Sequence, residues 1–418
     1  DEHTLEVVKK SSTSTLVKVT GMAISMILSV FLGRTIGAEG LGVINLSNRI
    51  VNVLLVIGLL GMRQVIVKEV SIAQTKGDYK HIANLMYTVY WLNGGTTLLL
   101  SILFIFLSPW LATAIFNEPS LTYPLMIALI AITPQAFTRI FSSSLVGYRK
   151  IWQSNLVEQT LSIAITGTIL LFLWFIDFNI DIINVAVSYV VGRIAVTLTV
   201  SIYWKRKYAI KNENKFIAKR LLKTSTPLFI FSVAGIITAS ADTVLLGILA
   251  DSKEVGLYTV AARIALLTGF FLQVTNASIA PKIASLFENG KITEMKLMVK
   301  KITTGLLILG FFQLILFLFT GKYILSIWGE EFIQSYYILI ILSFSQFVSI
   351  GTGAVGLILT MCGHERTQKN ISIFYLILNI IFNVVFISML GAIGAAITTA
   401  ITVMGSNVTK LVMVKKYI

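Results

Sequence analysis

Six ionisable side chains lie deep inside long apolar stretches of this sequence, where a charge must either be neutralised by a partner or bind a ligand. An ionisable group at bilayer depth costs about 2.5–3.5 kcal/mol on insertion scales and normally faces a cavity or a partner. The six are Arg49, Arg139, Glu158, Arg193, Asp242 and Arg263. Four arginines against two acids give a positive bias, and the planar guanidinium suits phosphate oxygens. The chemistry that these residues favour is therefore the binding of an anionic, phosphate-bearing cargo.

Arg49 shares a predicted helix face with two amides, since Asn45, Arg49 and Asn52 recur at i, i+4 and i+7. Arg49 and Arg263 lie about nine residues inside their outer helix ends, near 13 Å deep at about 1.5 Å per residue. Each deep arginine could instead form a structural ion pair within one bundle. That alternative is strongest for Arg263, because Asp242 reaches a similar depth on the preceding segment. Arg139 and Arg193 are candidates for either role.

Three charges, one of them among the six, are predicted near the cytoplasmic boundary. Lys18 and Arg63 lie close enough to helix ends for their long side chains to reach the membrane surface. Glu158 is also near the cytoplasmic end of its segment, where we expect a solvated residue. We therefore expect no cargo-binding role for these three.

The residues are carried by twelve apolar segments, each long enough to cross about 30 Å of hydrocarbon as a helix of about 20 residues. Hydrophobic residues make up 56% of the chain and charged residues 13%, against about 45–50% and 25% in soluble proteins. We therefore predict an all-α integral membrane protein. The segments are 12–33, 42–66, 83–107, 121–146, 152–176, 183–204, 226–249, 255–281, 303–320, 333–361, 371–389 and 392–412.

Lysine and arginine are concentrated in alternate gaps between these segments. Of the 34 cations, 25 fall on one set of loops and termini, and the opposite loops hold only Arg34, Lys253 and Lys322. The positive-inside rule then places both termini and the basic 205–223 segment in the cytoplasm. The net charge of +15 is explained by this topology and by attraction to anionic lipid, so nucleic acid is not an expected partner.

The two halves of the sequence resemble each other. Gly42 is followed seven residues later by Arg49-Ile50, and Gly256 is followed at the same spacing by Arg263-Ile264, an offset of 214 residues. Two further landmarks recur in the same order at similar offsets. We predict two parallel six-helix repeats around a central cavity, an N-lobe at 1–204 and a C-lobe at 224–418, joined by the linker 205–223.

Several function classes are disfavoured by what the sequence lacks. The longest outer loops hold about a dozen residues, too few for a folded catalytic domain. The lone Cys362 and three scattered histidines show no metal-ligand spacing. We therefore expect a transporter, not an enzyme, with no cofactor and no structural metal.

The stretches GRTIGAEGLGVINLSNRI (33–50) and ADTVLLGILADSKEVGLYTVAARI (241–264) resemble polysaccharide-transporter flippases such as the O-antigen flippases. These belong to the multidrug/oligosaccharidyl-lipid/polysaccharide exporter superfamily. The resemblance implies a pair of lobes in a bacterial cytoplasmic membrane that moves undecaprenyl-pyrophosphate-linked oligosaccharide outward by alternating access. It also implies a cationic lumen, which Arg49 and Arg263 match by position, and glycan polymerases as partners.

Some relatives, the lipid II flippases, have a sodium site on the seventh, eleventh and twelfth helices. This sequence offers oxygen ligands at those places, and hard cations take such ligands. They are Asp242, Asn379, Asn383 and Thr399. Coupling to Na⁺ or H⁺ is therefore an expectation, and hydrogen bonding between helices is the alternative.

Two other functions remain open from the sequence. A multidrug extrusion antiporter of the same superfamily would require a cavity suited to cationic drugs, which the excess of arginine disfavours. A membrane-embedded glycan polymerase or ligase would require a larger outer loop or convergent carboxylates. The leading prediction is the lipid-linked oligosaccharide flippase.

Overall fold

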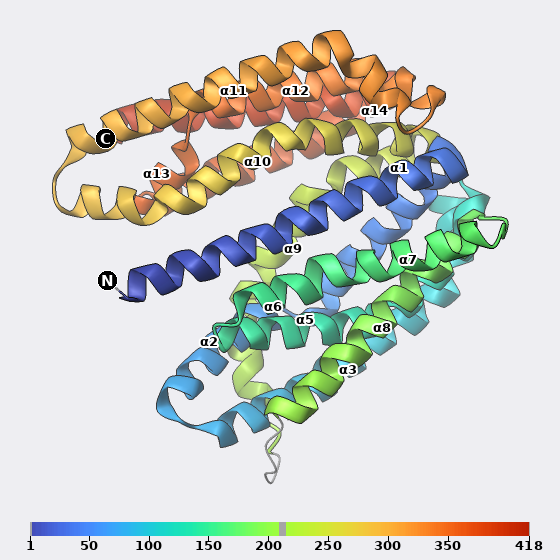
Figure 1. The fold of residues 1–418 in the computed structure, drawn as a ribbon, viewed down its shortest axis with the longest axis horizontal. Coiled ribbons are helices and arrows are strands. Elements are labelled where there is room, and N and C mark those ends of the chain that lie inside the picture. Colours follow the sequence, from blue (N-terminus) through green and yellow to red (C-terminus); the bar gives the residue numbers. More distant parts are fainter. Residues whose placement is uncertain (1, 209–214, 418) are drawn as a thin grey trace. The chain divides into compact units, whose positions relative to one another are not determined.

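A computed structural model describes residues 2–208 and 215–417, with side-chain surroundings from residue 13 onward except at 277. The described chain is helical apart from short connections and contains no strand, so the predicted all-α class is confirmed (Figure 1). The elements are α1 (Glu2–Leu59), α2 (Met62–Lys76), α3 (Tyr79–Trp110), the π-helical turn η1 (Leu111–Ile115), the 3₁₀ turn η2 (Pro119–Leu121), α4 (Thr122–Ile130), α5 (Ile132–Gly147), α6 (Ile151–Asn155), the π-helical turn η3 (Leu156–Thr160), α7 (Leu161–Phe175), α8 (Ile182–Tyr208), α9 (Ala218–Leu249), α10 (Ser252–Glu288), α11 (Ile292–Ser326), the 3₁₀ turn η4 (Glu330–Ser335), α12 (Tyr336–Thr352), α13 (Val355–Met361) and α14 (Glu365–Tyr417).

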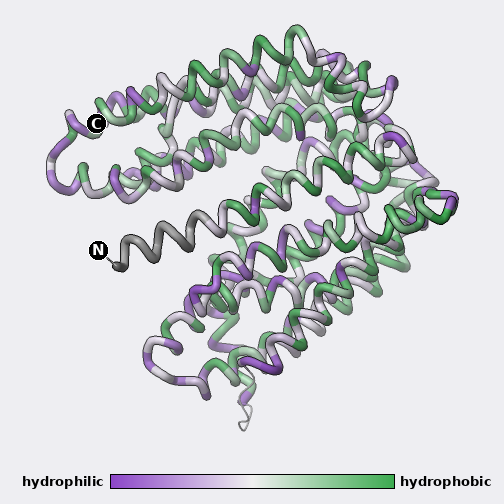
Figure 2. Tube along the Cα trace, in the orientation of Figure 1, coloured by the Kyte–Doolittle hydropathy of each residue, from purple (hydrophilic) through white to green (hydrophobic). Residues whose placement is uncertain are grey.

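Most of these helices are apolar on every side. Within the described residues, nine are long and apolar enough to cross a bilayer. A tenth span is formed if the segments Pro119–Ile130 and Ile132–Gly147, bent by 43°, are taken together. Large apolar side chains such as Phe106 and Phe319 are 80% exposed, and apolar residues run along most helices in Figure 2. Such surfaces are stable only against lipid, so the chain is a multi-pass membrane protein.

Two of the spans are single long helices where the sequence predicted two helices and a loop. Helix α1 covers 12–33 and most of 42–66, and α14 covers 371–389 and 392–412. Each is interrupted at one glycine with positive φ, Gly37 (φ 69°) in α1 and Gly391 (φ 56°) in α14. Glycine tolerates this backbone conformation because it has no Cβ. The two predicted loops are therefore kinks inside continuous helices.

A glutamate from a neighbouring element closes each kink. The Ala38 N–H donates to Oε1 of Glu331 at 2.7 Å, and the Ala392 N–H donates to Oε2 of Glu254. A kink interrupts the i→i−4 hydrogen bonds, and a backbone donor left unpaired near hydrocarbon is costly. The two glutamates supply the missing acceptors, and neither was predicted from the sequence.

The junction between α1 and α2 is a true break. Leu60 (φ 51°) and Gly61 (φ 73°) take positive φ, and α2 starts at Met62. The Gly58 carbonyl accepts from Nδ2 of Asn93 at 3.0 Å and from Oγ1 of Thr96 at 2.8 Å. Side chains of α3 therefore replace hydrogen bonds that the broken helix cannot make.

Contacts divide the chain into two compact units. The first contains residues 1–36 and 43–240, and the second contains residues 37–42 and 241–418. The division falls between Ser240 and Ala241, inside α9, whereas the sequence predicted a linker at 205–223. Of that linker, 209–214 lie outside the described residues.

The start of α9 belongs to the first unit because it packs against α2. A Cβ on Gly61 would lie 2.5 Å from the backbone nitrogen of Phe229, so the two backbones nearly touch. Nearby, Nε2 of Gln64 donates to Oγ of Ser232 at 3.1 Å. One continuous helix thus contributes to both units.

Candidate functional site

The part of α1 that follows the Gly37 kink presents a row of amides in the first unit. Arg139 of α5 donates from Nη2 to Oδ1 of Asn52 at 2.8 Å. Asn52 in turn donates from Nδ2 to the carbonyl of Asn48, one turn earlier, at 2.9 Å. Arg139 and Asn52, both predicted to bind cargo, are therefore in direct contact, and Asn45 lies one turn before Arg49 on the same helix.

Arg193 of α8 is held by three side chains. Its Nη2 donates to Oδ1 of Asn48 at 2.5 Å. With the Gln135 amide oriented to satisfy its neighbours, Nε and Nη1 both donate to Oε1 of Gln135 at 2.9 Å. The guanidinium also lies 5.7 Å from the centre of the Tyr189 ring, within cation–π range. All three guanidinium nitrogens are occupied, which favours a structural role for Arg193.

Glu158 forms a half-buried ion pair, whereas the sequence suggested a solvated boundary residue. The Arg63 Nη2 lies 2.7 Å from each carboxylate oxygen, and Ser142 donates from Oγ to Oε2 at 2.8 Å. The Glu158 side chain is 20% exposed and that of Arg63 is 37% exposed. A lone carboxylate is costly away from water, so tertiary structure brings Arg63 to it. Arg63 meets this carboxylate while its side chain stays 37% exposed, and its expected reach to the membrane surface stays a prediction.

Arg49 and Arg263 are half-buried residues of different units, Arg49 on α1 and Arg263 on α10. The prediction that they face one cavity from opposite sides stays a prediction.

The second unit contains a polar cluster around Asp242 of α9. Its Oδ1 accepts from Nδ2 of Asn383 at 2.7 Å. Its Oδ2 accepts from Oγ1 of Thr399 at 2.7 Å and from the hydroxyl of Tyr258 at 2.9 Å. Helices α9, α10 and α14 therefore meet at one carboxylate. These partners are neutral donors, and the suggested pairing of Asp242 with Arg263 stays a prediction.

Asn379 extends this cluster along α14. Its Oδ1 accepts from Nδ2 of Asn383 at 3.0 Å, and its Nδ2 donates to Oγ1 of Thr402 at 3.3 Å. Asn383 is fully buried, and its Oδ1 has no hydrogen-bond partner among the described residues. The Oγ1 of Thr398 is likewise buried without a partner there. The Oδ1 of Asn383, whose amide nitrogen donates to Asp242, is thus available to a further ligand.

Asn48, Gln135 and Tyr258 are functional-site neighbours that the sequence analysis missed. Asn48 carried a signal, since it falls between Asn45 and Asn52 on the same helical face. Gln135 and Tyr258 reach their partners only once the helices pack against each other, so no pattern in the sequence connects them.

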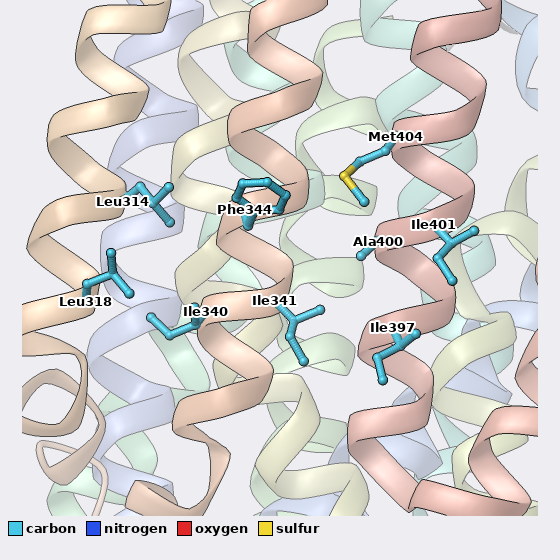
Figure 3. Close-up of a pocket in the computed structure, with 9 residues that line it drawn as sticks. All are labelled: Leu314, Leu318, Ile340, Ile341, Phe344, Ile397, Ala400, Ile401 and Met404. Carbon is cyan, nitrogen blue, oxygen red and sulfur yellow. The ribbon is translucent and has the colours of Figure 1, made fainter.

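Helix α14 presents an apolar face opposite this cluster. A cavity of about 410 Å³ lies between α11, α12 and α14, and every side chain that lines it is apolar (Figure 3). Its α14 lining consists of Ile397, Ala400, Ile401 and Met404, whereas Thr398, Thr399 and Thr402 project at other angles around the helix. With no donor or acceptor, the cavity accepts only hydrocarbon and excludes the charged part of any cargo.

Comparison with known proteins identifies the family. A family profile described as "Polysaccharide biosynthesis protein" matches residues 7–287, which is more than half of the chain. The chain belongs to this family. The polysaccharide-transporter resemblance seen in the sequence is therefore confirmed.

Two curated relatives of the family have informative names. The chain is 26% identical over 204 residues to the capsular polysaccharide biosynthesis protein CapF of Staphylococcus aureus, covering 48% of this chain and 52% of that protein. It is 24% identical over 211 residues to the probable low-salt glycan biosynthesis flippase Agl15 of Haloferax volcanii, covering 49% and 44%. The chain thus spans about half the length of the curated relatives that it matches.

Solved structures with the family's fold cover nearly the whole chain. The lipid II flippase MurJ in an inward closed conformation superposes with a TM-score of 0.75 at 18% identity, covering 98% of this chain and 87% of that one. A multidrug resistance MATE family transporter in an inward-facing conformation gives 0.77 at 11% identity, covering 98% and 97%. The chain therefore has the fold shared by these two transporter classes.

Proposed function

We propose that this protein is a flippase that moves a lipid-linked oligosaccharide across the cytoplasmic membrane, with undecaprenyl pyrophosphate as the lipid carrier. Membership of the polysaccharide biosynthesis family, a relative named as a glycan flippase, and the fold all support this proposal. The same relatives carry no enzyme name, which supports a transporter over a glycan polymerase or ligase. Such polymerases are proposed as partners that use the exported units.

The observation that carries the proposal is the excess of guanidinium groups within the membrane-spanning helices of the first unit. Arg139 and Arg193 lie on α5 and α8 and bond only to neutral amides, and Arg49 lies between those amides on α1. Positive charge held in a low-dielectric bundle attracts phosphate strongly. A drug antiporter would need the opposite bias, so the charge favours the flippase over the antiporter alternative.

The finer topology is part of the proposal. Counting α1 and α14 as two crossings each, together with the bent α4–α5 span, gives twelve crossings. We propose that these form two parallel six-helix repeats with both termini in the cytoplasm, which agrees with the placement of the lysines and arginines.

The Asp242 cluster is proposed to bind the coupling cation, Na⁺ or H⁺. A carboxylate, two amide oxygens and hydroxyls are the ligands that hard cations prefer, and the partnerless Oδ1 of Asn383 suits such an ion. Asp242, Asn379, Asn383 and Thr399 would hold the ion, whose positive charge would neutralise the Asp242 carboxylate. A shift of the melting temperature of purified protein in NaCl relative to KCl at equal ionic strength supports sodium binding. Equal melting temperatures leave these residues as interhelical hydrogen bonds.

The flippase proposal is tested by deleting the gene and analysing lipid-linked glycans by mass spectrometry on each side of the membrane. We expect complete, unpolymerised units to accumulate inside the cell and the intact gene to restore export. Incomplete glycans would contradict the proposal and indicate a glycan-building enzyme. Unchanged glycans with increased sensitivity to cationic drugs would indicate the antiporter.

A further inference from the structure

The ion pair between Arg63 and Glu158 engages only one of the three nitrogens of the Arg63 guanidinium. One nitrogen of Arg63, Nη2, serves both oxygens of Glu158. No other hydrogen bond of Arg63 is found among the described residues. A guanidinium has five N–H donors in a fixed fork. Arg63 therefore still offers donors after neutralising Glu158.

Arg139 is in the same situation. Its one hydrogen bond within the described chain runs from Nη2 to Asn52. Arg139 lies about one helical turn before Ser142 on α5, and Ser142 donates to Glu158 at 2.8 Å. Arg193, by contrast, has all three nitrogens engaged by Asn48 and Gln135. Arg193 therefore uses all of its guanidinium nitrogens, whereas Arg63 and Arg139 in the same unit keep N–H donors that have no hydrogen-bond partner among the described residues.

The charge of this group is unbalanced. Arg63 is paired with Glu158, Arg139 hydrogen-bonds to a neutral amide, and the other hydrogen-bond partner of Glu158 within the described chain is the hydroxyl of Ser142. Ser142 donates to Glu158 and exchanges a hydrogen bond with Ser154 at 2.7 Å. A net positive charge with spare donors in a membrane bundle suits a second anion.

The backbone around Glu158 supports a functional role. Glu158 lies in η3, a π-helical turn inserted between α6 and α7. Such turns are rare and are frequently found at functional sites. Arg63 is the second residue of α2, directly after the positive-φ residues Leu60 and Gly61. Both partners of the ion pair are therefore placed by local irregularities of their helices.

We propose that Arg63 and Arg139 form a phosphate-binding subsite in the first unit, with Glu158 as a resident counter-ion. An incoming pyrophosphate group takes over the two guanidinium groups, and the Glu158 carboxylate is released toward the hydroxyls of Ser142 and Ser154. The inference deepens the proposed function, because it rests on a cargo that carries pyrophosphate. It adds two residues, Arg63 and Glu158, to the cargo path.

The subsite and a purely structural ion pair predict different changes in anion affinity when Glu158 is neutralised. If Glu158 competes with the cargo, its neutral amide should improve anion binding, because the competing charge is gone. If the pair is only structural, Glu158→Gln loosens the bundle and anion binding does not improve. The sign of the change therefore decides between the two.

The experiment measures binding of farnesyl pyrophosphate to purified full-length protein in detergent by calorimetry, with farnesol as the phosphate-free probe. We expect Glu158→Gln to tighten farnesyl pyrophosphate binding about tenfold, which is about 1.4 kcal/mol. Arg63→Gln and Arg139→Gln should each weaken it by about tenfold or more. Farnesol binding should not change in any variant.

The chain supplies a matched control on the same unit. Glu69 accepts from Arg220 at 2.9 Å and from His81 at 2.7 Å, so it is another ion-paired acid. Glu69→Gln and Arg220→Gln remove the same charges elsewhere and should leave the affinity unchanged. If Glu158→Gln does not fold, Glu158→Asp keeps the charge but shortens its reach to Arg63, and it should tighten binding by a smaller factor.

Two outcomes overturn different proposals. Wild-type protein that binds farnesyl pyrophosphate no better than farnesol contradicts the pyrophosphate cargo, and with it both the subsite and this part of the proposed function. Binding of farnesyl pyrophosphate that is weakened or unaltered in folded Glu158→Gln, or in Glu158→Asp where Glu158→Gln does not fold, contradicts the subsite alone.

Discussion

Amide side chains on α1 hold two arginines of the first unit by hydrogen bonds that do not neutralise their charge. Asn48 and Asn52 each present an oxygen to a guanidinium from a different helix, Arg193 of α8 and Arg139 of α5. An amide oxygen accepts a hydrogen bond without neutralising the charge, so the arginines remain cationic inside the bundle. An aspartate at either position would form an ion pair and lower the attraction for an anionic cargo.

Arg193 is expected to matter for stability. Arg193→Gln leaves Asn48 and Gln135 without their donors in a region with little water, at a cost of about 1–3 kcal/mol. We expect a melting temperature several degrees below that of the wild type in the same detergent. Arg220→Gln is the control, because Arg220 is 63% exposed and an exposed ion pair contributes about 0–1 kcal/mol. Equal melting temperatures for the two variants would show that the Arg193 contacts are dispensable.

Arg49 is expected to matter for transport. At the repeat offset of 214, the position that corresponds to Asp242 is Leu28, so the first half lacks the equivalent acid. Arg49→Ala should abolish export of the glycan while the protein remains folded, and Arg49→Lys should retain partial function as a point charge. The readouts are lipid-linked glycans outside the cell and the amount of protein in the membrane. Normal export by a well-expressed Arg49→Ala variant would exclude a role in holding the cargo phosphate.

At the scale of helices, glycines set where backbones approach most closely. A Cβ on Gly42 would overlap the Ser252 carbonyl oxygen, and a Cβ on Gly256 would overlap the Ala38 carbonyl oxygen. The segment 37–42 and the start of α10, both in the second unit, therefore cross in direct backbone contact. Small residues allow such crossings in membranes, where van der Waals packing drives helix association.

Gly42→Ala is expected to destabilise the protein. The added methyl group collides with backbone that cannot rotate away, and overpacking of this kind costs about 1–3 kcal/mol. The matched control is Gly305→Ala on α11, where no atom lies within 4 Å of the new Cβ. That change should be neutral or slightly stabilising, because alanine favours helix over glycine. Thermal unfolding of both variants checks the prediction, which fails if Gly42→Ala melts with or above Gly305→Ala.

At the scale of the molecule, the Asp242 cluster joins three helices of the second unit. Tyr258, which donates to Asp242, lies on α10 together with Arg263. Thr399, the second donor, lies on the part of α14 that also lines the apolar cavity. A cation bound at Asp242, as proposed, would change these contacts and would thereby act on helices that extend well beyond the ion site.

We therefore expect cation and cargo binding to be coupled. Typical coupling of about 1–3 kcal/mol would change cargo affinity about 5–150-fold between sodium-loaded and sodium-free protein, and the effect is reciprocal. Binding of farnesyl pyrophosphate is measured in sodium and in potassium at fixed ionic strength, and again at several pH values. Asp242→Asn should lose any ion dependence, since the ligand charge is gone. Equal affinity in both salts and across pH would leave Asp242 as a structural residue.

The class of protein and most of the apolar segments could be predicted from the sequence alone, which also suggested the candidate residues. These depend on composition, segment length and depth within a segment, which are local properties. The sequence also indicated the Asp242, Asn379, Asn383 and Thr399 group, because the resemblance placed these residues on neighbouring helices. The structure brings all four together.

Which charges pair could be seen only in the folded structure. Arg63 and Glu158 are 95 residues apart, and Arg193 and Asn48 are 145 apart, so no local pattern connects them. The kinks at Gly37 and Gly391 likewise depend on Glu331 and Glu254 from other elements. A buried charge or a broken hydrogen-bond ladder is tolerated only when packing supplies its partner, and packing is a property of the folded chain.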